Sequence, residues 1–173
     1  SKIFTSTAVM KLVQTGQISL DESIRKYLPD LPEFYDAVSI IHLLTHTSGI
    51  TDCLTAPVYE VYNQDIYSFV KKQEELEFAP GTRYKYCNTA YVLLAIIIEE
   101  ASGESYRECL DKNIFSLCGM ENTVAGRDLS DKKFAISYHI SGSVDDRTNY
   151  YSGPGEIYTT AKDLYKFDRA YFS

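Results

Sequence analysis

The sequence lacks several features that would assign it to common functional classes. Its 173 residues include no tryptophan, three histidines and four cysteines. Cys53, Cys87, Cys109 and Cys118 contain no Cys-x-x-Cys pair, which argues against a zinc site and against a thioredoxin-like redox pair. Their even number leaves disulfides open, although four scattered cysteines in a chain of this size are more often free.

Long apolar runs and an excess of positive charge are also missing. No run approaches the roughly 18 apolar residues that a membrane helix needs, so we expect no membrane segment. The net charge of −7 disfavours nucleic acid or an anionic membrane as the main partner. With 45% hydrophobic and 24% charged residues, the composition is that of an ordinary globular protein with one sizeable core.

Helical periodicity dominates the chain, and we expect a single helix-rich domain over residues 1–173. A weak alternation predicts one strand over Phe134–Ile140. Residues 51–64 have mixed polarity and read as a long surface loop that could border a cleft, and residues 119–131 read as another loop. Capping residues and apolar spacing predict helices over residues 1–16, 23–27, 40–46, 65–72, 105–115 and 160–171.

The stretch from Pro80 to Ile98 organises the rest of the chain. Pro80-Gly81 is a turn signal, and Asn88 stands directly before a long apolar run, where its amide is expected to cap a helix. Tyr86 lies two positions before Asn88, so a phenol and an amide are expected together at the start of a well-anchored helix. A rigid, buried element of this kind holds reactive groups in place.

Several motifs, in order along nearly the whole chain, resemble the penicillin-recognising serine hydrolases. This family includes class C β-lactamases, D-alanyl-D-alanine peptidases and related esterases. Its second motif is matched by Pro-Gly-Thr-Arg-Tyr-x-Tyr-x-Asn-Thr, beginning at Pro80. Ser1-Lys2-Ile3-Phe4-Thr5 resembles the end of its Ser-x-x-Lys motif. Further matches lie in residues 16–22, 26–29, 41–50, 114–120 and 157–164.

The resemblance implies roles for three residues. Lys2 would be the motif lysine that activates a serine, and Tyr86 would take or relay the proton. Asn88 would hold Lys2 and a substrate amide. The nucleophilic serine would lie three residues before Lys2, outside this sequence, and the family's third motif, Lys/His-x-Gly, is not found before Ser173. We therefore expect a piece of a serine hydrolase that is inactive alone.

The fold and substrates follow from the same resemblance. The family pairs an antiparallel sheet with a helical subdomain, so we expect a mainly α chain that holds the helical subdomain and lacks most of the sheet. The resemblance implies acyl-enzyme chemistry on a β-lactam, a D-Ala-D-Ala peptide or an ester, with no cofactor and no metal. It also suggests a location outside the cytoplasm.

Two alternatives compete with the enzymatic reading. The first is a non-catalytic module that binds peptidoglycan-like ligands or serves a structural role. The second is a metal site, since His42 and His46 have the i, i+4 spacing of zinc ligands. The segment between them lacks the glutamate of His-Glu-x-x-His and no third ligand is obvious, so a capping or packing role is favoured.

Overall fold

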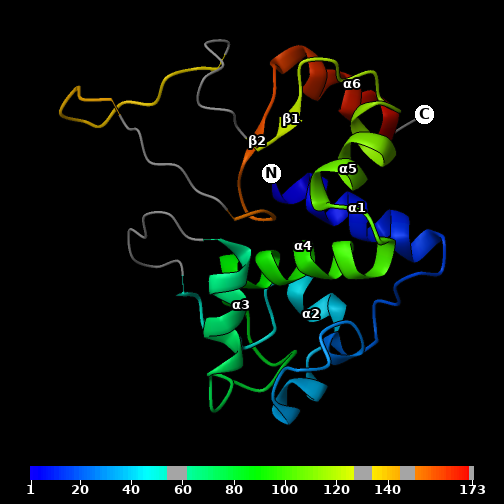
Figure 1. Cartoon of the computed structure of the whole chain (residues 1–173), viewed down its shortest axis with the longest axis vertical. Helices are drawn as coiled ribbons and strands as arrows, with labels where there is room; N and C mark the ends of the chain where they lie inside the picture. The colour runs from blue at the N-terminus through cyan, green and yellow to red at the C-terminus, as the bar shows by residue number, and fades with distance from the viewer. Residues whose placement is uncertain (54–61, 127–133, 145–150, 172–173) are drawn as a thin grey trace.

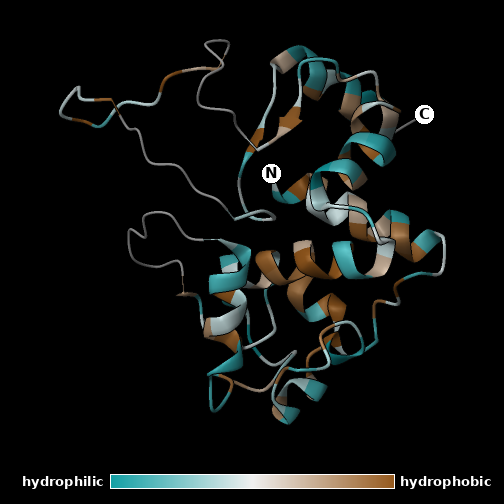
Figure 2. Cartoon of the chain, viewed as in Figure 1, coloured by the Kyte–Doolittle hydropathy of each residue, from teal (hydrophilic) through white to brown (hydrophobic). Residues whose placement is uncertain are grey.

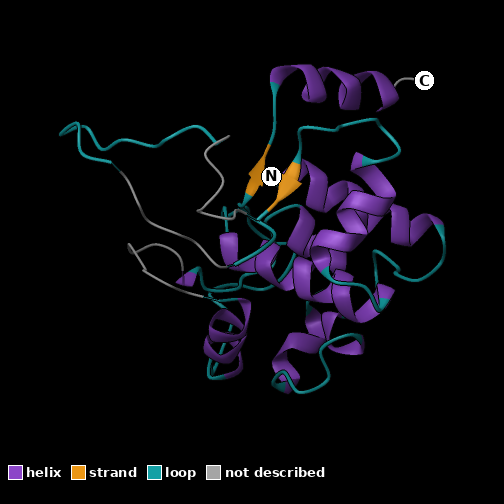
Figure 3. Cartoon of the chain, turned by 45° about the horizontal axis from the view of Figure 1, so that its top comes forward, coloured by secondary structure: helices purple, strands orange, loops and turns teal. Residues whose placement is uncertain are grey.

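The computed structural model describes residues 1–53, 62–126, 134–144 and 151–171. Helices predominate, and the strands described form one short pair (Figure 3). In chain order the elements are α1 (Lys2–Gln14), η1 (Ile24–Lys26), η2 (Glu33–Ala37), α2 (Ile40–Leu44), α3 (Asn63–Lys71), α4 (Asn88–Ser102), α5 (Tyr106–Leu110), η4 (Asp111–Phe115), β1 (Val124–Ala125), β2 (Ile157–Tyr158) and α6 (Ala161–Tyr171).

Helix α4 lies at the centre of the molecule. It packs against α1 and α5 on one side and against α2 and α3 on the other (Figure 1). Every residue from Thr89 to Ile98 is buried, and Figure 2 shows this helix as largely hydrophobic. A helix that is apolar all round is stable only when it is surrounded. It ends at Gly103, whose left-handed φ of 71° suits a residue without a Cβ.

Helix α1 joins this core to the last part of the chain. Its inner face buries Phe4, Ala8, Val9 and Leu12. The Phe4 ring lies against two aromatic rings from distant segments, with centroids 5.4 Å from Phe115 and 4.7 Å from Phe167. These contacts attach η4 and α6 to α1, and they hold the first turn of α1 in a fixed position over α4.

The predicted strand over Phe134–Ile140 is wrong. This segment forms only an isolated bridge between Tyr138 and Val144, and Ile136 and Ile140 are exposed. Phe134 is half-buried, with its ring centroid 4.9 Å from that of Tyr158, but the alternation beyond it is not matched by a core face that would bury the other apolar side chains. The observed strands lie elsewhere: β1 and β2 pair antiparallel, with Val124 opposite Tyr158 and Ala125 opposite Ile157.

The other expectations differ from the structure mainly at element ends. The helix predicted over residues 40–46 ends at Leu44, because His46 adopts a left-handed φ of 58°. The loop predicted over residues 51–64 ends earlier, since Asn63 and Gln64 belong to α3, and its residues 54–61 lie outside the described ranges. In the described ranges no helix has the length and apolarity required to cross a membrane. All four cysteines are free.

Candidate active site

The Lys2 side chain is the centre of the candidate site. Its ammonium donates to Asn88 Oδ1 at 2.9 Å and to the Pro154 carbonyl oxygen at 3.4 Å. Nζ also lies 4.8 Å from the centroid of the Tyr86 ring and 5.3 Å from that of Tyr91, within the range of cation–π attraction. The fold thus brings together Lys2, Tyr86 and Asn88.

Tyr86 lies at the surface edge of this cluster. The residue is 50% exposed, so it is open to solvent on one side. Its ring packs on the other side against the His46 imidazole, with centroids 4.6 Å apart. The ring therefore has a buried support and an open face, an arrangement that suits a group that must meet a ligand.

Asn88 does not cap α4, contrary to the sequence prediction. It is the first residue of the helix, and the N-cap position belongs to Cys87, whose Sγ accepts from Ala90 N–H at 3.4 Å. The Asp52 carboxylate accepts the N–H groups of Asn88 and Thr89 at 3.1 and 3.2 Å. A charged acceptor satisfies the free amides and the helix dipole better than an amide, and the Asn88 side-chain oxygen accepts from Lys2 instead.

His46 supports the aromatic part of the site. It is buried, and its ring lies against Tyr84, Tyr86 and Tyr91. Its Nδ1 accepts the Cys87 N–H at 3.2 Å, which places the imidazole proton on Nε2. Burial and the positive charge of Lys2 both lower the pKa of His46. A neutral ring therefore packs behind Tyr86.

The histidine pair does not form a metal site among the described residues, where no group of three or more His, Cys, Asp or Glu side chains could hold an ion. His42 completes the capping box of α2 instead. Its Nδ1 lies 3.2 Å from the Ser39 N–H and 3.1 Å from Ser39 Oγ.

A turn before β2 closes the site from the other side. The Gly153 carbonyl accepts from Thr5 Oγ1 at 2.7 Å, and Ile157 N–H donates to Ser1 Oγ at 3.3 Å. Gly153 has a φ of 106°, and a Cβ there would lie 2.1 Å from the Tyr91 carbonyl oxygen. Only glycine lets the backbone of this turn lie so close to α4. The close contact positions the Pro154 carbonyl next to Lys2.

Glu156, in the same turn, has an unusual environment. It adopts a left-handed φ of 67°, which is rare for a residue with a side chain. Burial raises its pKa from 4.5 to about 7, against an opposing effect of the Arg107 charge. The folded protein therefore holds this proton over a pH range in which the unfolded chain has released it.

Replacing Glu156 with glutamine should change the pH dependence of stability. Between about pH 4.5 and 7 the unfolded chain loses the proton first, so the free energy of unfolding of the wild type falls as the pH rises. At pH 8 Glu156→Gln should be more stable by on the order of 2 kcal/mol, and at pH 4 nearly unchanged. Denaturant titrations at both pH values check this, with the exposed Glu121→Gln as the control. Equal effects of Glu156→Gln at the two pH values would contradict it.

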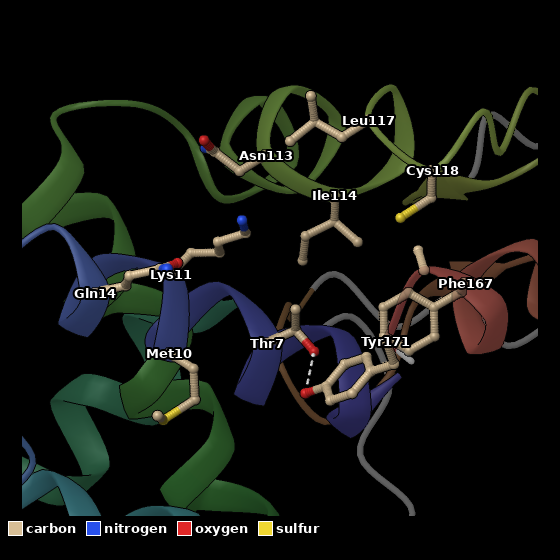
Figure 4. Close-up of a pocket in the computed structure, with 11 residues that line it drawn as sticks. Thr7, Met10, Lys11, Gln14, Asn113, Ile114, Leu117, Cys118, Phe167 and Tyr171 are labelled. Atoms are coloured by element: carbon tan, nitrogen blue, oxygen red, sulfur yellow. Dashed lines mark hydrogen bonds between the residues drawn. The ribbon is translucent and has the colours of Figure 1, made fainter. Parts of the chain in front are cut away.

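Two hollows adjoin α1. One, of about 540 Å³, is lined by Lys2, Ser6, Tyr91 and Leu164 among others, so it shares Lys2 with the candidate site. The other, of about 550 Å³, lies between α1, η4 and α6 (Figure 4). There Thr7 and Tyr171 form a hydrogen bond of 3.4 Å, and the lining contains none of Lys2, Tyr86 and Asn88. Of these two hollows, the first is therefore the one that Lys2 lines, and Tyr86 and Asn88 line neither.

Comparison with known proteins decides the family. The model of the family described as Beta-lactamase matches residues 1–171. The chain belongs to this family. A curated penicillin-binding protein of Bacillus subtilis (strain 168) is 32% identical to it over 99% of this chain and 43% of that relative. The chain therefore spans less than half the length of this relative.

Solved structures of the family share the fold. A penicillin binding protein from Bacillus halodurans is 29% identical, with a TM-score of 0.84 over 99% of this chain and 58% of that one. The D-amino acid amidase from Ochrobactrum anthropi SV3 complexed with L-phenylalanine amide is 29% identical, with a TM-score of 0.79 over 99% and 53%. The family is one of serine hydrolases, and the prediction of a mainly α part of its fold is confirmed.

Sequence reasoning missed three groups at the candidate site. These are the Asp52 carboxylate that binds Asn88, the His46 ring that supports Tyr86, and the Pro154 carbonyl that accepts from Lys2. The i, i+4 spacing of His42 and His46 marked His46 as a residue of interest, although it did not indicate contact with Tyr86. No such pattern marked Asp52, since it lies 36 residues before Asn88 in a segment expected to be surface loop.

Proposed function

We propose that residues 1–173 are part of a serine hydrolase that forms an acyl-enzyme on a β-lactam, a D-Ala-D-Ala peptide or an ester. Lys2 acts as the base, Tyr86 relays the proton, and Asn88 orients Lys2 and a substrate amide. The observation that carries the proposal is the hydrogen bond of 2.9 Å from Lys2 Nζ to Asn88 Oδ1, beside the Tyr86 ring.

The helical conformation of α1 supports the position that we propose for the nucleophile. Residues i and i+3 share a helix face, so a serine three residues before Lys2 would present its hydroxyl to the lysine amine. The amine takes the hydroxyl proton as Oγ attacks the substrate carbonyl. The Lys2 ammonium formed in this way returns the proton through Tyr86 to the leaving nitrogen or oxygen, and water then hydrolyses the acyl-enzyme and restores the serine hydroxyl. Backbone N–H groups, including that of the serine, would stabilise the oxyanion.

The 173-residue chain by itself should show no burst and no turnover with a chromogenic β-lactam or a p-nitrophenyl ester. It carries no serine three residues before Lys2, so no acyl-enzyme forms. Loss of the nucleophile typically removes most of the rate. A polypeptide extended beyond both ends of residues 1–173, with that serine in place, should acylate; this is the extended polypeptide below.

The same stopped-flow assay on both polypeptides tests the proposal. Turnover by the 173-residue chain that an active-serine reagent blocks would show that the nucleophile lies elsewhere. An extended polypeptide that binds penicillin but never acylates would favour the non-catalytic binding module.

A further inference from the structure

Asp52 stands out among the buried charged groups that the proposed mechanism does not use. It is only 9% exposed. One of its carboxylate oxygens binds Asn88, and the other binds Thr89. Oδ2 accepts from the Asn88 N–H at 3.1 Å and from Asn88 Nδ2 at 3.2 Å. Oδ1 accepts from the Thr89 N–H at 3.2 Å and from Thr89 Oγ1 at 3.1 Å.

These contacts determine which way the Asn88 amide faces. An asparagine amide has a donor end and an acceptor end, and a buried carboxylate accepts only the donor end. With Nδ2 bound to Asp52, Oδ1 must face the opposite direction, where it accepts from the Lys2 ammonium at 2.9 Å. Reversal of the amide would set oxygen against carboxylate and NH2 against ammonium, two repulsive contacts at once.

We infer that Asp52 is a positioning residue that fixes the Asn88 amide with its oxygen toward Lys2. The inference rests on the proposed function for its catalytic consequence, but its structural part stands on the hydrogen bonds alone. Asp52 touches neither Lys2 nor the reacting atoms in this assignment, and it acts through Asn88. The same carboxylate anchors the first two N–H groups of α4, so the orientation of the amide is coupled to the start of the central helix.

The structural part is tested on the 173-residue chain by NMR. The Asn88 side-chain NH2 protons, identified by their loss in Asn88→Ala, should exchange slowly with solvent in the wild type. In Asp52→Asn they should exchange about tenfold faster or more, since the neutral amide cannot accept from all four donors. Unchanged exchange in Asp52→Asn would overturn the inference.

A matched control separates positioning from general stability. Asp163, like Asp52, is a buried carboxylate; it lies in the first turn of α6 and accepts from the Asn122 N–H at 2.7 Å and from Thr123 Oγ1 at 3.1 Å. In the part of the chain that the structure describes, it forms no hydrogen bond or ion pair with Lys2 or Asn88, and it pairs instead with Lys166 at 3.2 Å. Asp163→Asn should lower stability as Asp52→Asn does, yet leave the exchange of the Asn88 amide as in the wild type.

The catalytic part is tested on the extended polypeptide with a double-mutant cycle. Asp52→Asn should lower the acylation rate by about 10- to 100-fold, whereas Asp163→Asn should keep it within about threefold of the wild type at a temperature where both are folded. In an Asn88→Ala background, Asp52→Asn should have little further effect, because Asp52 acts through that amide.

The outcomes distinguish the inference from the function on which it rests. Additive effects of Asp52→Asn and Asn88→Ala would show that Asp52 does not act through Asn88. An equal loss of activity in Asp163→Asn and Asp52→Asn would show that Asp52 affects activity only through the stability of the fold. If the extended polypeptide never acylates, the proposed function fails, and the exchange measurement still decides the orientation of Asn88.

Discussion

Lys2→Ala in the extended polypeptide is expected to lower the acylation rate by about 10²- to 10⁴-fold, the usual contribution of a positioned general base. The amine that accepts the serine proton is removed. The Asn88 oxygen and the Pro154 carbonyl, which both accept from Lys2 Nζ, also lose their donor. Stopped-flow measurement of acylation by a chromogenic β-lactam gives the rate.

Lys2→Arg separates the base from the charge. A guanidinium stays protonated, so it preserves a cation beside Tyr86 and a donor to Asn88 but cannot accept a proton. If Lys2 is the base, the arginine variant should be nearly as slow as the alanine variant. Recovery of most of the rate by Lys2→Arg would reduce Lys2 to an electrostatic role. Lys11→Ala, an exposed position on the same helix, serves as the control and should acylate normally.

Leu94→Ala is expected to lower the free energy of unfolding of the 173-residue chain by about 2–5 kcal/mol, the range for a buried leucine truncated to alanine. Leu94 is completely buried in the middle of α4, the helix that packs against four other helices. The cavity left behind cannot be filled easily from a helix surrounded on all sides. Denaturant titration monitored by circular dichroism gives the value.

Glu100→Ala is the control for this prediction. Glu100 lies on the same helix but is exposed, so its loss should change stability by no more than about 0.5 kcal/mol. A change under about 1 kcal/mol for Leu94→Ala would be incompatible with α4 as the core of the fold.

The local patterns of the sequence predicted the helices well, because apolar periodicity and caps act over a few residues. Ser39 and Ser105 cap helices where the sequence places them. The strand over residues 134–140 was wrong because strand formation depends on a partner and a core face, and neither is visible in a local window. The observed strands are two residues each, too short to leave a pattern.

The candidate site shows the same contrast between residues that a local motif reveals and residues that only the tertiary structure brings together. Lys2, Tyr86 and Asn88 could be selected because their motifs occur in order along the chain. Asp52 and the Pro154 carbonyl could not, since each reaches the site from a segment far from its partner in sequence. The cap of α4 was misassigned for this reason: the charge that satisfies its first N–H groups comes from a residue that only the tertiary structure brings there.

The most direct test of the account is the location of the acyl group. The extended polypeptide is incubated with penicillin, quenched, digested and mapped by tandem mass spectrometry, with Lys2→Ala and Asp163→Asn treated in parallel. We predict a single adduct on the serine three residues before Lys2, abundant in Asp163→Asn and nearly absent in Lys2→Ala. An adduct on any other residue, or an equal yield in the Lys2→Ala variant, would contradict the assignment of Lys2, Tyr86 and Asn88 as the acylation site.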